Sequence, residues 1–350
     1  MNALAGDLDR VLASTEALWD DLRGQRLFIT GGTGFFGCWL LESFLWANDA
    51  LDLGASVVVL TRRPHVFAQK APHLAGHPAL QLHQGDVRTF AYPEGEFDAV
   101  IHAATDVERP GDDLSLFDSI VTGTRRTLEF ARNAGAKRFL LTSSGAVYGR
   151  QPADLGHLSE EYAGAPDPAS RRSAYGEGKR AAEMLCALHA EDGRLEPTIA
   201  RCFAFVGPYL PLDVHFAAGN FIRDGLAGGP IRIAGDGTPY RSYLYAADLA
   251  IWLWTILLRG QPLRPYNVGS DAALSIAELA ALVARLFGPA MAVEVARAPV
   301  PGAMPERYVP AVGRAQVELG LRQTVPVIEA LRRTIVWHES RQMASSHAHL

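Results

Sequence analysis

Hydrophobic and polar positions follow two rhythms along about the first 200 residues of the chain. Short apolar or β-branched runs predict strands at 26–30, 56–60, 80–83, 99–102, 139–142 and 198–201. Between them, apolar residues that recur every three to four positions predict helices, including 36–47, 116–133 and 175–189. Strand, helix and strand in series give right-handed crossovers and a parallel sheet with helices on both faces. The expected fold class is therefore α/β, with a doubly wound parallel sheet.

This rhythm changes after about residue 200, where loops become longer and richer in Gly and Pro. We expect 25–200 to form the main domain, to which some later segments return, and 201–340 to form mainly a smaller mixed α/β lobe. Apolar spacing over 1–24 predicts an amphipathic helical extension on the outside of the fold, and the polar residues 341–350 predict a frayed tail. The apolar run at 249–258 is too short to span a bilayer and predicts a buried helix.

Composition and charge narrow the class of function. The chain has 350 residues, of which 48% are hydrophobic and 20% charged, as in ordinary globular proteins. Its net charge of -5 offers no electrostatic footprint for nucleic acid or an anionic membrane, so neither is expected as a partner. Cys38, Cys186 and Cys202 lack metal-ligand spacing and predict reduced core cysteines, no metal site and a cytoplasmic location. No signal peptide is expected.

The strongest motif is a glycine-rich turn, LFITGGTGFFG, between the first predicted strand and the first helix. Gly31 and Gly34 let the backbone approach a pyrophosphate, and Gly37 lets helix and strand pack closely. At Phe35 and Phe36 the helix begins, and its free N–H groups and positive dipole end face the phosphates. Because a strand precedes the motif and a helix follows it, the sequence predicts a Rossmann-type domain that binds NAD(P).

The residues that end the second predicted strand bear on which dinucleotide is bound. An NAD site usually has a carboxylate there that accepts hydrogen bonds from the ribose hydroxyls. This chain has Thr61, Arg62 and Arg63 instead. The two arginines could hold a 2′-phosphate through charge-assisted bonds; alternatively, one stacks on the adenine and the other is solvated, which would tolerate NAD. NADP is slightly favoured over NAD.

A tyrosine, a lysine and a serine form the candidate catalytic set. Tyr175 and Lys179 lie four positions apart on one helix face. A tyrosine of pKa ~10 is a poor base at neutral pH, but a neighbouring ammonium and a bound nicotinamide cation favour the phenolate and lower that pKa. Ser144 ends the fifth strand, where α/β sheets place their active sites. It could donate to a substrate oxygen, or merely cap the following loop.

The glycine turn, Ser144 and the Tyr-x-x-x-Lys pair, in this order and spacing, resemble the extended short-chain dehydrogenase/reductase family. More narrowly, they resemble its nucleotide-sugar epimerase, dehydratase and decarboxylase branch, over roughly residues 25–338. The resemblance implies that Asp86, followed by Val87, meets the adenine amino group. It also implies that Ala103 and Ala104 lie beside the cofactor ribose and pyrophosphate.

The same resemblance implies a nucleoside-diphosphate sugar as the second ligand. Asn220 and Arg241 would contact its diphosphate, and Arg307 would be a second diphosphate arginine. Guanidinium forks suit phosphate oxygens, although the alternative of a solvated surface arginine is stronger for Arg307 than for Arg241. His215 lies in the loop that should cover the sugar. It could act as an acid or base or hold a sugar substituent, but an ordinary loop histidine is the favoured interpretation.

Departures from the family pattern are informative as well. The 4,6-dehydratases have Asp and Glu at the two positions after the serine, where this chain has Gly145 and Ala146. The uronate decarboxylases need a Glu, and the 3,5-epimerases of GDP-mannose a Cys, where Ala146 stands. These chemistries are therefore disfavoured in their familiar form. Ala204 and Ile120 replace two asparagines of the family, which bears on sugar orientation and local cofactor contacts.

What remains is chemistry that needs only Ser144, Tyr175, Lys179 and the nicotinamide. A nucleotide-sugar 4-epimerase, which removes and returns a hydride through a 4-keto intermediate, ranks first. An NADPH-dependent reductase of nucleotide-4-keto-sugars ranks second, and a dehydratase that uses Tyr175 as its base ranks third. A non-catalytic regulator that senses a dinucleotide is the alternative from another class.

A homodimer is also implied by the resemblance. The helices at 116–133 and 175–189 correspond to those that pair across a two-fold axis in related proteins. An apolar face on the second helix would suit that pairing or simple internal packing: Ala181, Ala182, Leu185 and Leu188.

Overall fold

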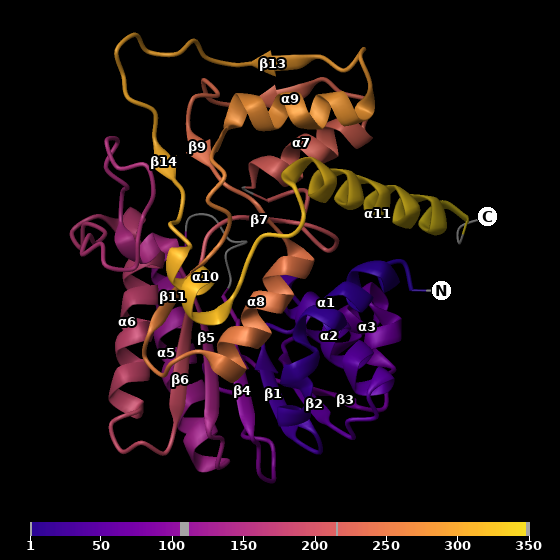
Figure 1. Ribbon diagram of the computed structural model, residues 1–350, viewed down its shortest axis with the longest axis vertical. Coiled ribbons are helices and arrows are strands. Elements are labelled where there is room, and N and C mark those ends of the chain that lie inside the picture. The colour runs from indigo at the N-terminus through magenta and orange to yellow at the C-terminus, as the bar shows by residue number, and fades with distance from the viewer. Residues whose placement is uncertain (1, 106–111, 215, 348–350) are drawn as a thin grey trace.

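The computed structural model describes residues 2–105, 112–214 and 216–347 of the protein, without the side chains of 344–347 (Figure 1). The described residues contain a seven-stranded sheet with the order β11-β6-β5-β4-β1-β2-β3, and all of its strands are parallel. The strand order reverses between β1 and β4, and open α/β sheets bind ligands at the carboxyl ends of such neighbours. The strands are β1 (Arg26–Thr30), β2 (Ser56–Thr61), β3 (Leu80–Gln84), β4 (Ala99–His102), β5 (Arg138–Ser144), β6 (Glu196–Cys202) and β11 (Pro265–Val268).

The six strands predicted from the sequence are all present, which confirms the doubly wound α/β fold. No bound moves by more than two residues; the strand expected at 198–201, for example, runs over Glu196–Cys202. The seventh strand, β11, was not predicted. Its four residues PYNV contain a proline and show no clear alternation, so periodicity gives no signal there.

Helices cover both faces of the sheet (Figure 1). Alternate residues of β1 point to opposite faces: Leu27 and Ile29 belong to one core cluster and Phe28 to the other. The helix α8 is buried along nearly its whole length, as predicted for 249–258. The first cluster includes α1 (Ala5–Trp19), α2 (Phe35–Ala50) and α8 (Ala246–Arg259); the second includes α5 (Asp113–Asn133) and α6 (Ala174–His189).

The N-terminal helix α1 packs its apolar face against the main fold and leaves its other face exposed, as an amphipathic helix does. Leu8 and Val11 are each 1% exposed. The Trp19 ring lies 5.2 Å from the Trp254 ring of α8. The apolar face of α1 is therefore buried against its neighbours in the core.

Most of the elements after β6 form a smaller mixed lobe against the carboxyl end of the sheet (Figure 1). Short strands pair within it, β7 with β10, β8 with β13, and β9 with both β12 and β14. Since strands of two or three residues carry little hydrophobic pattern, the sequence predicts only a dispersed mixed region here. The strands are β7 (Phe205–Val206), β8 (Ile231–Ile233), β9 (Tyr240–Arg241), β10 (Leu244–Tyr245), β12 (Leu274–Ser275), β13 (Val293–Val295) and β14 (Arg307–Tyr308).

The helices of this lobe include α11, which runs back toward the side of the first lobe where α3 lies (Figure 1). This helix continues through 341–347, the part of the chain expected to be frayed. A polar composition predicts exposure, and the side chains of 341–343 are exposed. The expectation of a frayed tail over 341–350 stays a prediction. The helices not yet given are α3 (Pro64–Lys70), α4 (Pro72–Ala75), α7 (Ala217–Leu226), α9 (Ile276–Phe287), α10 (Gly313–Leu319) and α11 (Val327–His347), with short 3₁₀ segments η1 (Asp20–Leu22), η2 (Gly145–Tyr148) and η3 (Arg171–Ser173).

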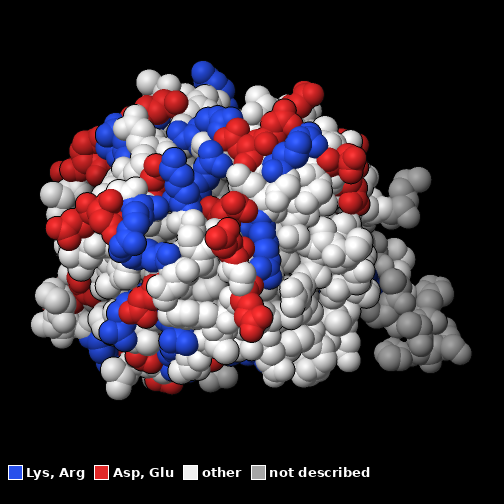
Figure 2. Space-filling view, turned by 90° about the horizontal axis from the view of Figure 1, so that it is seen from below, with Lys and Arg blue, Asp and Glu red and all other residues white. Residues whose placement is uncertain are grey.

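The surface carries both acidic and basic side chains, and the cysteines lie in the interior. Figure 2 shows acidic and basic side chains interspersed on one face, beside a broad region without charged residues. Cys38, Cys186 and Cys202 are buried and unpaired, as predicted. Among the helices of the described part of the chain, none is long and apolar enough to cross a membrane. The described residues also contain no group of three His, Cys, Asp or Glu side chains that could hold a metal ion.

Candidate active site

The glycine-rich turn joins β1 to α2 at the carboxyl edge of the sheet. Gly31 has a φ of +72°, and a Cβ there would lie 2.4 Å from the carbonyl oxygen of Ala103 at the end of β4. Only glycine combines that backbone conformation with so close an approach. A Cβ on Gly37 would lie 2.3 Å from Cα of Gly32, so α2 starts in direct contact with the turn. The turn is as tight as the sequence predicts.

The N-terminus of α2 follows the glycine-rich turn directly and is partly exposed. Gly34, its N-cap residue, is exposed and donates its N–H to the Gly31 carbonyl at 3.1 Å. At Phe35 and Phe36 the helix begins, and the ring of Phe36 packs edge-on against Phe205 at 5.0 Å. A backbone cradle with a helix N-terminus above it fits the pyrophosphate of a dinucleotide.

The end of β2 carries the two arginines without a nearby acid in the sequence. Thr61 is buried, and its carbonyl accepts a hydrogen bond from the Gly85 N–H at 3.0 Å. Arg62 and Arg63 are exposed, and Arg63 is the N-cap residue of α3. The side chains expected near the 2′ position of the cofactor ribose are thus cationic and accessible.

Asp86 follows β3 and forms an ion pair with Arg88. Nε of Arg88 donates to its carboxylate at 2.9 Å. That bond and, to a smaller extent, the charge of Arg62 hold the pKa of Asp86 below its ordinary value. Val87 packs against the helix α5 at Gly123, where a Cβ would come within 2.9 Å of it. Asp86 remains ionised, as an acceptor for an amino group requires.

The end of β4 is fixed to the glycine turn through Thr30. The N–H of Ala103 donates to the Thr30 carbonyl at 3.1 Å, and that of Ala104 to its hydroxyl at 3.3 Å. His102 lies between the hydroxyls of Thr30 and Thr124, at 2.7 and 3.0 Å. Burial lowers the pKa of His102 to about 3. This histidine is therefore neutral and holds the strand ends in place.

Three predicted catalytic residues come together above the carboxyl end of β5. Ser144 ends that strand, while Tyr175 and Lys179 lie on α6. Nζ of Lys179 donates to the Thr142 carbonyl at 2.8 Å and to the Thr105 hydroxyl at 2.7 Å, and it lies 5.9 Å from the centre of the Tyr175 ring. Thr105 was not predicted as a member of this set, although it follows the predicted strand at 99–102 within three residues.

Burial determines the pKa values of Tyr175 and Lys179. Burial raises the pKa of Tyr175 above its ordinary value, and a hydrogen bond with Ser144 opposes that rise. Burial also lowers the pKa of Lys179 to about 8. Burial of the phenol therefore outweighs the hydrogen bond with Ser144. The lowering of the Tyr175 pKa by the ammonium together with a bound nicotinamide cation stays a prediction. Lys179 still carries its charge at neutral pH.

An aromatic pair occupies the space beside Ser144. Oγ of Ser144 accepts a hydrogen bond from the Ala146 N–H at 3.1 Å and lies 3.4 Å from the Tyr308 hydroxyl. The Tyr308 ring packs on Phe203 at 4.6 Å. A Cβ on Gly145 would lie 2.6 Å from that Phe203 ring. A side chain at the position after Ser144 would therefore require the Phe203 ring to shift. Tyr308 is a site residue that the sequence did not single out, although Arg307 precedes it.

The strand register separates the two arginines expected at the substrate diphosphate. In the β9–β14 pair, Tyr308 is opposite Arg241 and Arg307 is opposite Tyr240. Because neighbouring residues of a strand point to opposite faces, Arg241 shares a face with Tyr308 and Arg307 does not. The Arg241 guanidinium lies 6.0 Å from the Tyr308 ring centre, whereas that of Arg307 lies 4.4 Å over Tyr240. The structure brings only Arg241 to the side of Ser144.

Asn220, another substrate candidate, lies near the start of α7. The side chain of Asn220 accepts a hydrogen bond from Nη1 of Arg223 at 3.2 Å and is partly buried. Gly219, just before it, packs under the Pro211 carbonyl, which a Cβ would approach to 2.6 Å. His215 lies outside the described residues.

The two positions that depart from the family's asparagines, Ala204 and Ile120, both pack within or against hydrophobic core clusters. The Ala204 carbonyl accepts a hydrogen bond from the Leu244 N–H at 3.0 Å. Ile120 is 1% exposed and packs against α6, where a Cβ on Gly178 would lie 3.2 Å from it. Ile120 thus serves the packing of α5 on α6, and it has no polar group to offer a ligand.

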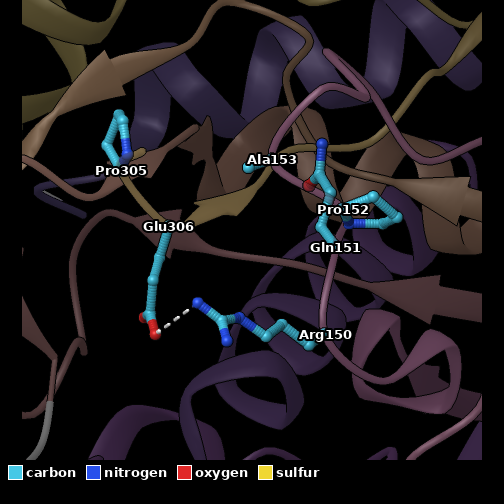
Figure 3. Close-up of a pocket in the computed structure, with 6 residues that line it drawn as sticks. All are labelled: Arg150, Gln151, Pro152, Ala153, Pro305 and Glu306. Atoms are coloured by element: carbon cyan, nitrogen blue, oxygen red, sulfur yellow. Dashed lines mark ion pairs between the residues drawn. The ribbon is translucent and has the colours of Figure 1, made fainter. Parts of the chain in front are cut away.

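A pocket of about 280 Å³ lies beside β14 (Figure 3). The buried side chain of Gln151 donates to the Leu155 carbonyl at 2.7 Å and accepts from the Val309 N–H at 3.0 Å. Arg150 and Glu306 form an ion pair at 3.8 Å across it, which Figure 3 marks. The loop after η2 therefore holds the strand that carries Tyr308. The lining residues are Arg150, Gln151, Pro152, Ala153, Pro305 and Glu306.

Comparison with known proteins agrees with this geometry. The model of the NAD dependent epimerase/dehydratase family matches residues 27–269. UDP-glucuronic acid decarboxylase 1 of Xenopus tropicalis is 30% identical over 314 residues, which are 89% of this chain and 71% of that protein. UDP-glucuronic acid decarboxylase 6 of Arabidopsis thaliana is 30% identical over 315 residues, which are 87% of this chain and 88% of the relative.

Solved structures with the same fold include two with a bound dinucleotide. A dTDP-glucose 4,6-dehydratase from Streptomyces venezuelae, with NAD bound, has a TM-score of 0.77 and 26% identity, and the match covers 91% of this chain and 98% of that one. A UDP-glucuronic acid 4-epimerase from Bacillus cereus, in complex with UDP-glucuronic acid and NAD, has a TM-score of 0.75 and 22% identity over 90% and 99% of the two chains. The latter likeness concerns the fold alone.

Proposed function

Since the chain belongs to the NAD dependent epimerase/dehydratase family, we propose that it is a nucleotide-sugar 4-epimerase that works through a 4-keto intermediate. Its coarse description follows from the family, an NAD-dependent enzyme of the extended short-chain dehydrogenase/reductase type. The observation that carries the finer proposal is the set Ser144, Tyr175 and Lys179, in which the two positions after the serine, Gly145 and Ala146, carry no acid.

Each catalytic residue has a distinct task in this proposal. A bound nicotinamide dinucleotide supplies the hydride acceptor and donor, together with a positive charge that favours the Tyr175 phenolate. Tyr175 takes the proton of the sugar 4-hydroxyl and later returns it. Ser144 donates a hydrogen bond to the same oxygen, and Lys179 holds its ammonium below the tyrosine through Thr105 and Thr142.

Loss of water or of carbon dioxide has weaker support. The dehydratases and decarboxylases that the chain resembles use an acidic side chain after the serine, and Ala146 has none. At Gly145 an acid would also collide with the Phe203 ring. The curated relatives at 30% identity are named decarboxylases, so decarboxylation is the outcome to test first against epimerisation.

Arg241 and Asn220 are the residues proposed to bind the diphosphate of the sugar nucleotide. The position of Arg241 beside Tyr308 supports a role on the diphosphate of a UDP- or dTDP-sugar. Asn220 is proposed to contact the same diphosphate, from the start of α7. The packing of Arg307 over Tyr240 leaves it a lesser role, at the edge of the site.

Incubation of the protein with UDP-, dTDP-, GDP- and CDP-sugars, including UDP-glucuronic acid, tests the proposal. Proton NMR of the products is expected to show a 4-epimer, formed with NAD(P) alone and without net consumption of the cofactor. A pentose product with released carbon dioxide, or a product that has lost water, would contradict the proposal.

A reductase of nucleotide-4-keto-sugars is the second candidate, and one observation favours it. Arg62 and Arg63 are exposed at the end of β2, where they suit the 2′-phosphate of NADP. NADPH in turn suits reduction. We propose a modest preference for NADP, to be measured as the ratio of the dissociation constants of NADP⁺ and NAD⁺. A clear preference for NAD⁺ would remove this support, and a keto-sugar reduced with stoichiometric use of NADPH would replace the epimerase proposal.

We also propose a homodimer that pairs α5 and α6 with their copies. The expected apolar face of α6 is divided: Ala182 is buried and Leu185 packs inside, while Leu188 is 61% exposed beside the exposed Met184. Analytical ultracentrifugation is expected to give a dimer for the wild type and a monomer for Leu188→Glu. A wild-type monomer at micromolar concentration would contradict the pairing.

A further inference from the structure

We propose that Lys70 is a positioning residue of the phosphate-binding turn and that the C-terminal helix α11 holds it in place through Arg341. Nζ of Lys70, the last residue of α3, donates to the carbonyl oxygen of Thr33 at 2.8 Å. Thr33 lies inside the glycine turn, between Gly32 and Gly34. The inference rests on dinucleotide binding by the family and is independent of the sugar reaction.

The bond from Lys70 orients a peptide group that closes the turn. The Thr33 carbonyl and the Gly34 N–H belong to one planar peptide unit. The Gly34 N–H donates to the Gly31 carbonyl at 3.1 Å. A charge-assisted bond at one end of this unit therefore fixes the direction of the bond at its other end. The N–H groups that meet a pyrophosphate follow directly, at the start of α2.

The ammonium also adds charge where the ligand is anionic. Lys70 is partly buried, and its Nζ lies 5.8 Å from the centre of the Tyr209 ring. A positive group held next to the N-terminus of α2 adds to the potential of the helix dipole there. Both dinucleotides share the pyrophosphate, so Lys70 is expected to support NAD⁺ and NADP⁺ alike.

Two contacts from α11 converge on this lysine. Nη2 of Arg341 donates to the Lys70 carbonyl at 2.7 Å. The Trp337 ring packs on Tyr209 at 4.8 Å, and the Arg341 guanidinium lies 4.9 Å over Trp337. One contact holds the backbone of Lys70, and the other holds the ring beneath its side chain. Figure 1 shows the end of α11 on the side of the molecule where α1 to α3 lie.

The test compares binding by charge-matched variants. Lys70→Met keeps the aliphatic stem without the ammonium, and Lys70→Arg restores a cationic donor. Arg341→Gln removes the guanidinium that donates to the Lys70 carbonyl, a contact between α11 and α3 that we call the clasp. Lys137→Met, an exposed lysine, and Arg332→Gln, an exposed arginine of the same helix, are the controls. Calorimetry gives the dissociation constants of NAD⁺, NADP⁺ and UDP for each protein. If cofactor copurifies, its rate of release into cofactor-free buffer replaces the first two values.

We expect Lys70→Met to weaken both dinucleotides by about 5- to 30-fold, Arg341→Gln by about 2- to 5-fold, and Lys70→Arg to return affinity to within about 3-fold of wild type. UDP binding, melting temperature and both controls should stay unchanged. Equal dinucleotide affinity in Lys70→Met and wild type would overturn the proposal. So would a parallel loss of UDP binding and melting temperature without rescue by Lys70→Arg, because that pattern is general unfolding.

Discussion

The hydroxyl oxygen of Tyr308 lies 3.4 Å from that of Ser144, although 164 residues separate the two in sequence. The serine oxygen also accepts the Ala146 N–H. When Tyr308 donates to it as well, both acceptor sites of the serine are used. Its own proton is then left for the Tyr175 oxygen, with which Ser144 forms a hydrogen bond, or for a substrate oxygen placed beside it. The second lobe thus sets the direction in which Ser144 donates.

Tyr308→Phe is expected to lower kcat by about 3- to 30-fold, because the serine proton loses its fixed direction. Cofactor affinity and melting temperature should be unchanged. Tyr240→Phe, on the paired strand and the opposite face, is the control and should keep full activity. Steady-state kinetics on the sugar nucleotide identified by NMR give the comparison, and equal kcat in Tyr308→Phe and wild type would contradict the orienting role.

Tyr175→Phe is expected to reduce turnover by about 100-fold or more, since no other group at the site is proposed to take the proton of the sugar hydroxyl. Calorimetry should give a cofactor dissociation constant within twofold of wild type. A protein that only senses a dinucleotide would behave alike with either residue. Unchanged turnover in the variant would defeat the proposed mechanism.

Gly145→Asp is expected to destabilise the protein by about 2 kcal/mol without creating a dehydratase, because its Cβ would press on the Phe203 ring. Thermal melting measures the loss, and NMR of the product shows whether water leaves. Gly156→Asp is the control, since that glycine is exposed and its Cβ would have nothing within 4 Å. A stable Gly145→Asp protein that dehydrates a sugar would show that space is not what excludes the acid.

The pH dependence of activity should reflect Lys179. Burial lowers its pKa to about 8, so its charge is lost as pH rises through 8, where an exposed lysine would keep it to about 10.4. kcat/KM is expected to fall by up to about tenfold per pH unit above 8, because the neutral amine no longer favours the phenolate.

The same lysine also contributes to the pH dependence of stability. Between about pH 8 and 10.5 the unfolded chain binds a proton at Lys179 that the folded chain does not, so this residue alone makes the free energy of unfolding rise with pH. Burial raises the pKa of Cys38, Cys186 and Cys202, which makes the free energy of unfolding fall with pH over the same range. The contribution of Lys179 is therefore measured as the difference between wild type and Lys179→Met in denaturant titrations at pH 7.5 and 9.5. The variant is expected to lose more stability than wild type between these pH values, and an equal loss in both proteins would contradict the role of Lys179.

Local patterns explain why much of this site was predictable. The glycine turn, the end of β5 and the Tyr175–Lys179 spacing each lie within one short segment, and the sheet then brings the strand ends together. Long-range contacts carry no such signal. The face on which Arg241 or Arg307 lies depends on the register of two-residue strands, and the contact of Tyr308 with Ser144 depends on how two lobes meet. The raised pKa of Tyr175 likewise follows from burial, which spacing alone does not report.

The clasp between α11 and α3 has a consequence for the order in which this protein assembles. Lys70 and Arg341 are 271 residues apart, whereas the glycine turn and its strand belong to the first part of the chain to leave the ribosome. Domains generally begin to fold from the N-terminal side during synthesis, at about 5–20 residues per second. The turn therefore waits on the order of tens of seconds before its last support is made. A newly made sheet domain can be compact long before its dinucleotide turn has all of its contacts.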